Sequence, residues 1–159
     1  MSIECDEDRN SPGRFLGRCT GTSARTVNDV ASMLQKVSDY FAGLGKPVRL
    51  EYLTLDHPIQ QGDQYQIFFD YYELDAESAT GQRVPMRLSV TCTMVGSPAL
   101  ARIEVSVGGD NVSGLVKSAI QSLGRYEGWV VEDIILHDRI NESGVHDPLL
   151  RIYMLSSSG

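Results

Sequence analysis

TVNDVASMLQKVSDYFAGL, residues 26–44, repeats its apolar side chains at intervals of three and four. That spacing places them along one face of an α-helix. Thr26 is a suitable N-cap, and Asp29 brings a carboxylate to the positive end of the helix dipole. Gly45 and Pro47 end the periodic pattern. A helix this amphipathic is marginal alone in water, so we expect later strands to cover its apolar face.

Six later segments alternate apolar and polar side chains or concentrate aromatic residues, as strands do. They are residues 48–56, 64–74, 86–94, 101–107, 129–136 and 149–155. A second amphipathic helix precedes the last two segments and ends at Gly124. The order helix, four strands, helix, two strands predicts an α+β fold, in which an antiparallel sheet of about six strands carries both helices on one face.

The third and fourth of these segments have the strictest alternation and predict a hairpin. Pairing Cys92 with Ile103, and Val90 with Val105, keeps every apolar side chain on one face of the sheet. A slip of one residue would turn the apolar set toward water, so the pattern fixes which face is buried.

The ends of the chain differ from the rest in composition. Within residues 1–25, residues 1–13 are acidic with few apolar side chains, which predicts a flexible tail. Residues 14–25 are an arginine-containing leader that is either a short ordered arm or a further flexible lead-in, and composition favours a partly ordered leader. Residues 156–159 are Ser and Gly and predict a second flexible tail. We therefore expect a single domain over residues 26–155, and we find no internal sequence repeat.

Composition excludes some function classes. The 159 residues carry a formal charge of −7, from 21 acidic and 14 basic side chains spread along the chain. Proteins that bind nucleic acid or anionic membranes non-specifically cluster Lys and Arg on a basic domain, so we expect neither partner. Without a long apolar run or a signal-like start, we expect a cytoplasmic protein.

The sequence offers little for catalysis or metal binding. It has no nucleophile motif and no phosphate-binding glycine pattern, so we expect no cofactor. Each of the three histidines adjoins an aspartate, and His137 and His146 flank one predicted hairpin loop. These two imidazoles are the candidates for a metal site, although their spacing matches no known metal motif, and we expect no metal.

The aromatic stretch over residues 64–74 contains the most distinctive chemistry of the chain. If its first alternating set meets the helix, Phe68 and Tyr72 face outward, and with Tyr52 they are candidates for partner binding. The alternative is that a loop or the N-terminal arm covers these aromatic side chains. The inward set suggests instead a ligand pocket between the sheet and the first helix. Its lining residues would be Tyr40, Phe41, Tyr65 and Phe69.

Three functions remain open at this point. The leading hypothesis is a non-catalytic protein-binding module, adaptor or chaperone-like, which binds another protein or forms a homodimer through an aromatic sheet face or a strand edge. The second is a small-molecule-binding or regulatory domain that uses the predicted pocket. The third is a metal-assisted enzyme built on the His–Asp pairs.

Overall fold

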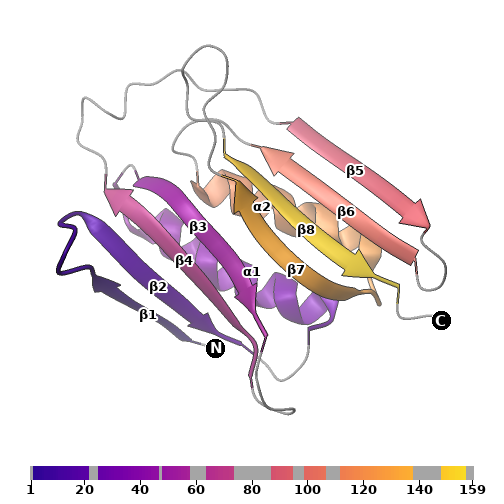
Figure 1. Ribbon diagram of the computed structural model, residues 1–159, viewed down its shortest axis with the longest axis horizontal. Helices are drawn as coiled ribbons and strands as arrows, with labels where there is room; N and C mark the ends of the chain where they lie inside the picture. The colour runs from indigo at the N-terminus through magenta and orange to yellow at the C-terminus, as the bar shows by residue number, and fades with distance from the viewer. Residues whose placement is uncertain are drawn as a thin grey trace.

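The computed structural model contains one eight-stranded antiparallel sheet and two α-helices (Figure 1). It describes residues 2–21, 25–46, 48–57, 64–73, 87–94, 99–106, 112–137 and 148–156. The strands are β1 (Ser2–Glu7), β2 (Arg14–Thr20), β3 (Val48–Asp56), β4 (Gln66–Glu73), β5 (Arg87–Met94), β6 (Ala99–Ser106), β7 (Val130–His137) and β8 (Leu149–Leu155). The helices are α1 (Val27–Gly43) and α2 (Val112–Leu123), and a short 3₁₀ turn, Gly124–Tyr126, follows α2.

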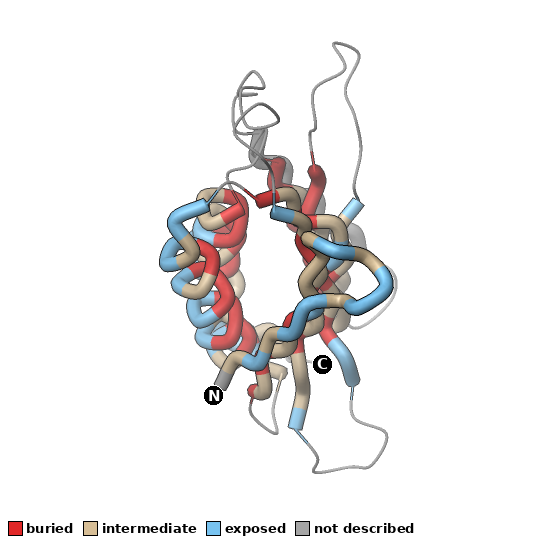
Figure 2. The backbone as a smooth tube through the Cα atoms, turned by 90° about the vertical axis from the view of Figure 1, so that its left-hand side faces the viewer, coloured by how far each residue is buried: buried red, intermediate tan, exposed pale blue. Residues whose placement is uncertain are grey.

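The molecule has two layers, with both helices on one face of the sheet (Figures 1 and 2). Figure 2 shows the buried residues of the helices and of the strands turned toward each other between the layers. The Thr26 side chain accepts a hydrogen bond from the Asp29 backbone N–H at 3.3 Å, so the predicted cap begins α1. The predicted α+β fold is confirmed, with eight strands in place of about six.

The two additional strands come from residues 2–20, where the sequence predicted a flexible tail and leader. In β2, the buried Gly17 and Cys19 alternate with Arg14, Leu16 and Arg18, which face away from the helices. β2 pairs with β4 along its whole length, and β1 pairs with β2. Charged side chains at the outward positions gave this segment the composition of a disordered one, although its inward positions are those of a strand.

The β5–β6 hairpin forms in a register two residues away from the predicted one. Val90 pairs with Ile103 and Cys92 pairs with Ala101. A shift of two keeps each residue on its face of the sheet, so alternation alone does not distinguish the two registers. The predicted pairing of Cys92 with Ile103 and of Val90 with Val105 was therefore wrong.

The two halves of the chain share one connectivity. β1-β2-α1-β3-β4 is followed by β5-β6-α2-β7-β8, and the sheet order is β1-β2-β4-β3-β7-β8-β6-β5. The halves therefore meet at β3 and β7, and the strand order is mirrored on the two sides of that junction. α1 packs against α2, with the Ser38 hydroxyl 3.3 Å from that of Ser113. This approximate twofold symmetry was not detected in the sequence.

A β-bulge occurs at the same place in each half. The β3–β4 register shifts between Leu50 and Tyr52, and the β7–β8 register shifts between Val131 and Asp133. The bulges contain Glu51 and Glu132, each three residues before the paired residues Thr54 and Ile135 at the junction. A bulge turns two successive side chains to one side of the sheet.

Candidate functional site

The sheet face away from the helices carries a group of large apolar side chains on three neighbouring strands. We call Leu16 of β2, Tyr52 of β3, and Phe68 and Tyr72 of β4 the outer patch. Among the described residues, the exposed large hydrophobic side chains are Leu16, at 44%, and Tyr52, at 48%. Both flank Asp70 of β4 across the sheet. The three predicted partner-binding residues therefore lie on one surface, joined by Leu16.

Two local features turn these side chains outward. In β4, Ile67, Phe69 and Tyr71 are buried toward α1, which leaves the alternate residues on the other face. In β3, strict alternation from Val48 would have buried Tyr52. The bulge reverses this, because buried Leu50 and Leu53 now bracket two outward residues, Glu51 and Tyr52.

Arg14 holds one side of the outer patch in place. Its guanidinium donates a 2.6 Å hydrogen bond to the Asp70 carboxylate, and its central carbon lies 6.0 Å from the Tyr72 ring centroid. The hydrogen bond to Asp70 is the main reason that the pKa of Arg14 is raised. Arg18 pairs with Glu4 on the neighbouring β1. The Arg14 contacts fix the outward side chains of β2 beside those of β4, and the Arg18–Glu4 pair joins β2 to β1.

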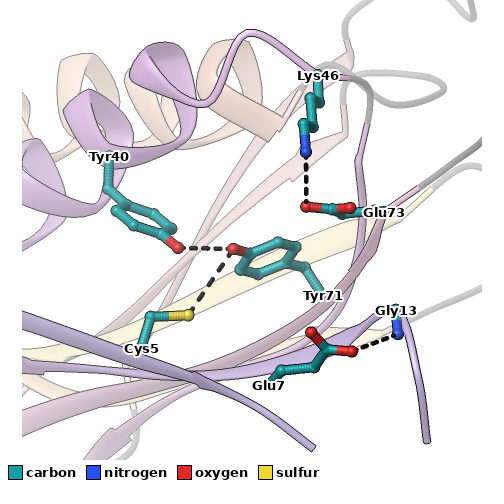
Figure 3. Close-up of polar contacts among 7 residues, drawn as sticks. All are labelled: Cys5, Glu7, Gly13, Tyr40, Lys46, Tyr71 and Glu73. Atoms are coloured by element: carbon teal, nitrogen blue, oxygen red, sulfur yellow. Dashed lines mark hydrogen bonds and ion pairs between the residues drawn. The ribbon is translucent and has the colours of Figure 1, made fainter.

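On the helix side of the sheet, two tyrosine hydroxyls and a thiol meet between β1, β4 and α1 (Figure 3). The Tyr40 and Tyr71 hydroxyls are 2.6 Å apart, and the Cys5 Sγ lies 3.7 Å from the Tyr71 hydroxyl. Burial is the largest cause that raises the pKa of Tyr40 to about 12, and it raises the pKa of Tyr71 as well. Both phenols therefore stay protonated near neutral pH. Through the Tyr71 hydroxyl, Cys5 and Tyr40 join β1 and α1 to β4.

The four residues of the predicted ligand pocket do not form one group. The Phe41 and Phe69 ring centroids are 5.2 Å apart, and Tyr40 packs against both rings. Tyr65 instead contacts His57, with ring centroids 5.5 Å apart. Three of the four side chains thus pack on one another as part of the core, and their role in ligand binding stays a prediction.

The structure gives one of the two candidate metal ligands a protein partner. His137 Nε2 lies 3.2 Å from a guanidinium nitrogen of Arg151, while His146 lies outside the described residues. Within the described ranges, no group of three or more His, Cys, Asp or Glu side chains is arranged to hold a metal ion. In the same ranges, neither helix is long and apolar enough to cross a membrane.

Comparisons with known proteins give no relative for this chain: no family model, no curated protein and no solved structure matches it.

Sequence reasoning missed Leu16 and the cluster of Cys5, Tyr40 and Tyr71. Leu16 lies in the segment predicted to be flexible, so its exposure could not be assigned to a sheet face. The alternation of Arg14, Leu16 and Arg18 with smaller or buried residues was the available signal. The hydroxyl cluster joins residues 66 positions apart along the chain, a contact that no local pattern indicates.

Proposed function

We propose that this protein is a non-catalytic protein-binding module whose binding surface is the outer patch. The observation that carries the proposal is the exposure of Leu16 and Tyr52 side by side with Phe68 and Tyr72 on an open sheet face. Tyrosine and other aromatic side chains provide contact area with few rotatable bonds, and contiguous exposed apolar patches are typical of interaction sites. An adaptor or a chaperone-like protein would use such a surface.

The construction of the patch supports binding without rearrangement. Asp70 lies between Leu16 and Tyr52, and Arg14 holds it by a 2.6 Å hydrogen bond. Tyr72 packs beside the same arginine. A surface whose side chains are already held in place loses less conformational entropy when a partner binds.

The experiment replaces the two exposed apolar residues together, as Leu16→Ser/Tyr52→Ser. We expect this variant to lose most of the partner recovered with the wild type, because the two most exposed apolar side chains of the patch are removed. Thermal unfolding should change little, since both residues are only about half covered and lie outside the buried core. Native mass spectrometry of the purified complexes, alongside unfolding curves, measures both quantities.

The matched control is Gln35→Ser/Lys36→Ser, which alters two exposed residues of α1 on the opposite side of the molecule. It should retain the partner. Equal loss of partner in both double variants, or no loss in either, would show that the outer patch is not the binding surface. A second copy of the chain in the complex would identify the partner as a homodimer mate.

A further inference from the structure

We infer that the outer patch, if it binds a protein as proposed above, takes a partner segment that combines Lys or Arg with apolar side chains. The inference rests on the charges that border the patch. Six carboxylates stand on or beside it against three guanidinium groups. The acidic residues are Glu4, Asp6, Asp8, Glu51, Asp56 and Asp70, and the basic residues are Arg14, Arg18 and Arg49.

The basic side chains next to Leu16 are already used within the protein. Arg14 pairs with Asp70 at 2.6 Å and with Asp8 at 3.8 Å, and Arg18 pairs with Glu4. Arg49 has no ion pair with another described residue, and its Nε is buried without a hydrogen-bond partner in that part of the chain. Of the three basic groups named above, only the partly buried guanidinium of Arg49 is left for a partner.

Two of the remaining acidic groups, Asp6 and Glu51, adjoin the two exposed apolar side chains. Asp6 is exposed and pairs across the strands with Leu16. Glu51 faces outward at the bulge beside Tyr52, and Asp56 is exposed at the end of the same strand. None of the three makes an ion pair with another described residue. Each apolar contact point is therefore bordered by a carboxylate that a partner can neutralise.

Charge complementarity then decides between the classes of partner. A second copy would bring the same acidic border and a further net charge of −7 to the interface, and like charges disfavour close approach. A basic segment would pair with Asp6 and Glu51 while its apolar side chains cover Leu16 and Tyr52. Tyr52 also offers a ring face to a Lys or Arg side chain.

The experiment uses the full chain and two labelled peptides, KLLKKLLK and its acidic counterpart ELLEELLE, with binding measured by fluorescence anisotropy. We expect the basic peptide to bind more tightly, and we expect its affinity to fall between about 20 mM and about 200 mM salt as screening increases. Asp6→Asn/Glu51→Gln should weaken that binding by about two- to tenfold at low salt, as expected for two exposed pairs.

The control Asp39→Asn/Glu127→Gln makes the same change in net charge at exposed positions elsewhere. It should leave the affinity within about twofold of the wild type. Equal weakening by the two double variants would mean that the peptide responds only to net charge. That result would overturn the inference, as would tighter binding of ELLEELLE.

Three further outcomes separate this inference from the proposed function. If Leu16→Ser/Tyr52→Ser weakens partner binding and Asp6→Asn/Glu51→Gln does not, the outer patch remains the binding surface and only the basic partner is refuted. If the free protein self-associates and Leu16→Ser/Tyr52→Ser abolishes this, a second copy is the occupant and the inference fails. If Leu16→Ser/Tyr52→Ser affects no binding at all, the proposed function itself fails.

Discussion

Gly17→Ala tests the position of β2, which sequence reasoning placed in a flexible leader. Gly17 pairs with Phe69 of β4, and a Cβ atom at residue 17 would overlap Cε2 and Cζ of the Phe69 ring. That ring is fully buried, and it packs on Phe41 at 5.2 Å and on Tyr40 at 5.7 Å, so it has little room to turn away. One methyl group should therefore strain the core.

We expect Gly17→Ala to lower the free energy of unfolding by about 1–3 kcal/mol, the usual cost of overpacking a filled core. Chemical denaturation followed by circular dichroism measures the change. Gly43→Ala is the matched control, because a Cβ there meets nothing within 4 Å and the residue lies in α1. In a helix interior this change stabilises by about 0.5–1 kcal/mol, so at Gly43, the last residue of α1, we expect a stabilisation of at most that size and no loss.

A double variant shows whether Phe69 is the cause. Phe69→Ala alone should cost about 3–5 kcal/mol through lost burial and a cavity. With the ring absent, the added methyl group at residue 17 has space, so the double variant should cost less than the sum of the two single changes by about 1–3 kcal/mol. If Gly17→Ala is neutral, or if the two changes simply add, β2 does not lie against Phe69 in this register.

The remaining predictions concern other parts of the fold. Ile103→Ala, at a fully buried position of β6, should destabilise by about 2–5 kcal/mol in denaturant titration, whereas Arg102→Ala on the outer face should cost at most about 1 kcal/mol; equal costs would contradict the assigned faces. Folding raises the pKa of Tyr40 from 10.0 to about 12, so the free energy of unfolding should be unaffected by this group below about pH 10 and should fall as the pH rises toward 12. Tyr40→Phe should make that fall shallower, and an equally steep fall in the variant would show that Tyr40 does not cause it. Removing residues 1–13 should lower the thermal unfolding midpoint because β1 packs Ile3 and Cys5 against the core. An unchanged midpoint would instead support the flexible tail that the sequence predicted.

Local signals were enough to predict α1 and the strands that follow it. The apolar periodicity and the Thr26 cap lie within one stretch of sequence, and the cap forms as expected. β2 was missed because it pairs with β4, about fifty residues later, and β1 because it joins the sheet only through β2. The outward charges of both strands gave the segment the composition of a disordered one. Pairing partners far apart in sequence leave no periodic trace in either strand.

The candidate site likewise contains residues that the sequence could place and residues that it could not. Phe68 and Tyr72 could be placed outside from the alternation of β4, since the buried set was recognisable. Tyr52 lies on that surface only because of the bulge at Glu51, and no residue type in this segment predicts a bulge. Leu16 joins them only once β2 is part of the sheet. A site spread over three strands depends on their order in the sheet, and that order cannot be inferred from the sequence of any single strand.

The repeated halves show that the fold does not require the outer patch. The pairs Leu16–Asp70 and Asp70–Tyr52 occupy the same positions in their half as Arg102–Tyr153 and Tyr153–Asp133 in the other.

On the helix side of the sheet, by contrast, the three side chains paired across neighbouring strands fit one another in volume in both halves. The large Phe69 stands between Gly17 and Leu53, whereas in the second half Ile152 stands between Ile103 and Ile134. The core preserves its packing through compensating sizes, as a filled interior must. The outer rows are not constrained in this way, because Leu16 and Tyr52 of one half correspond to the charged Arg102 and Asp133 of the other. Packing demands therefore do not account for Leu16 and Tyr52 on an exposed sheet face, and we propose that binding a partner does.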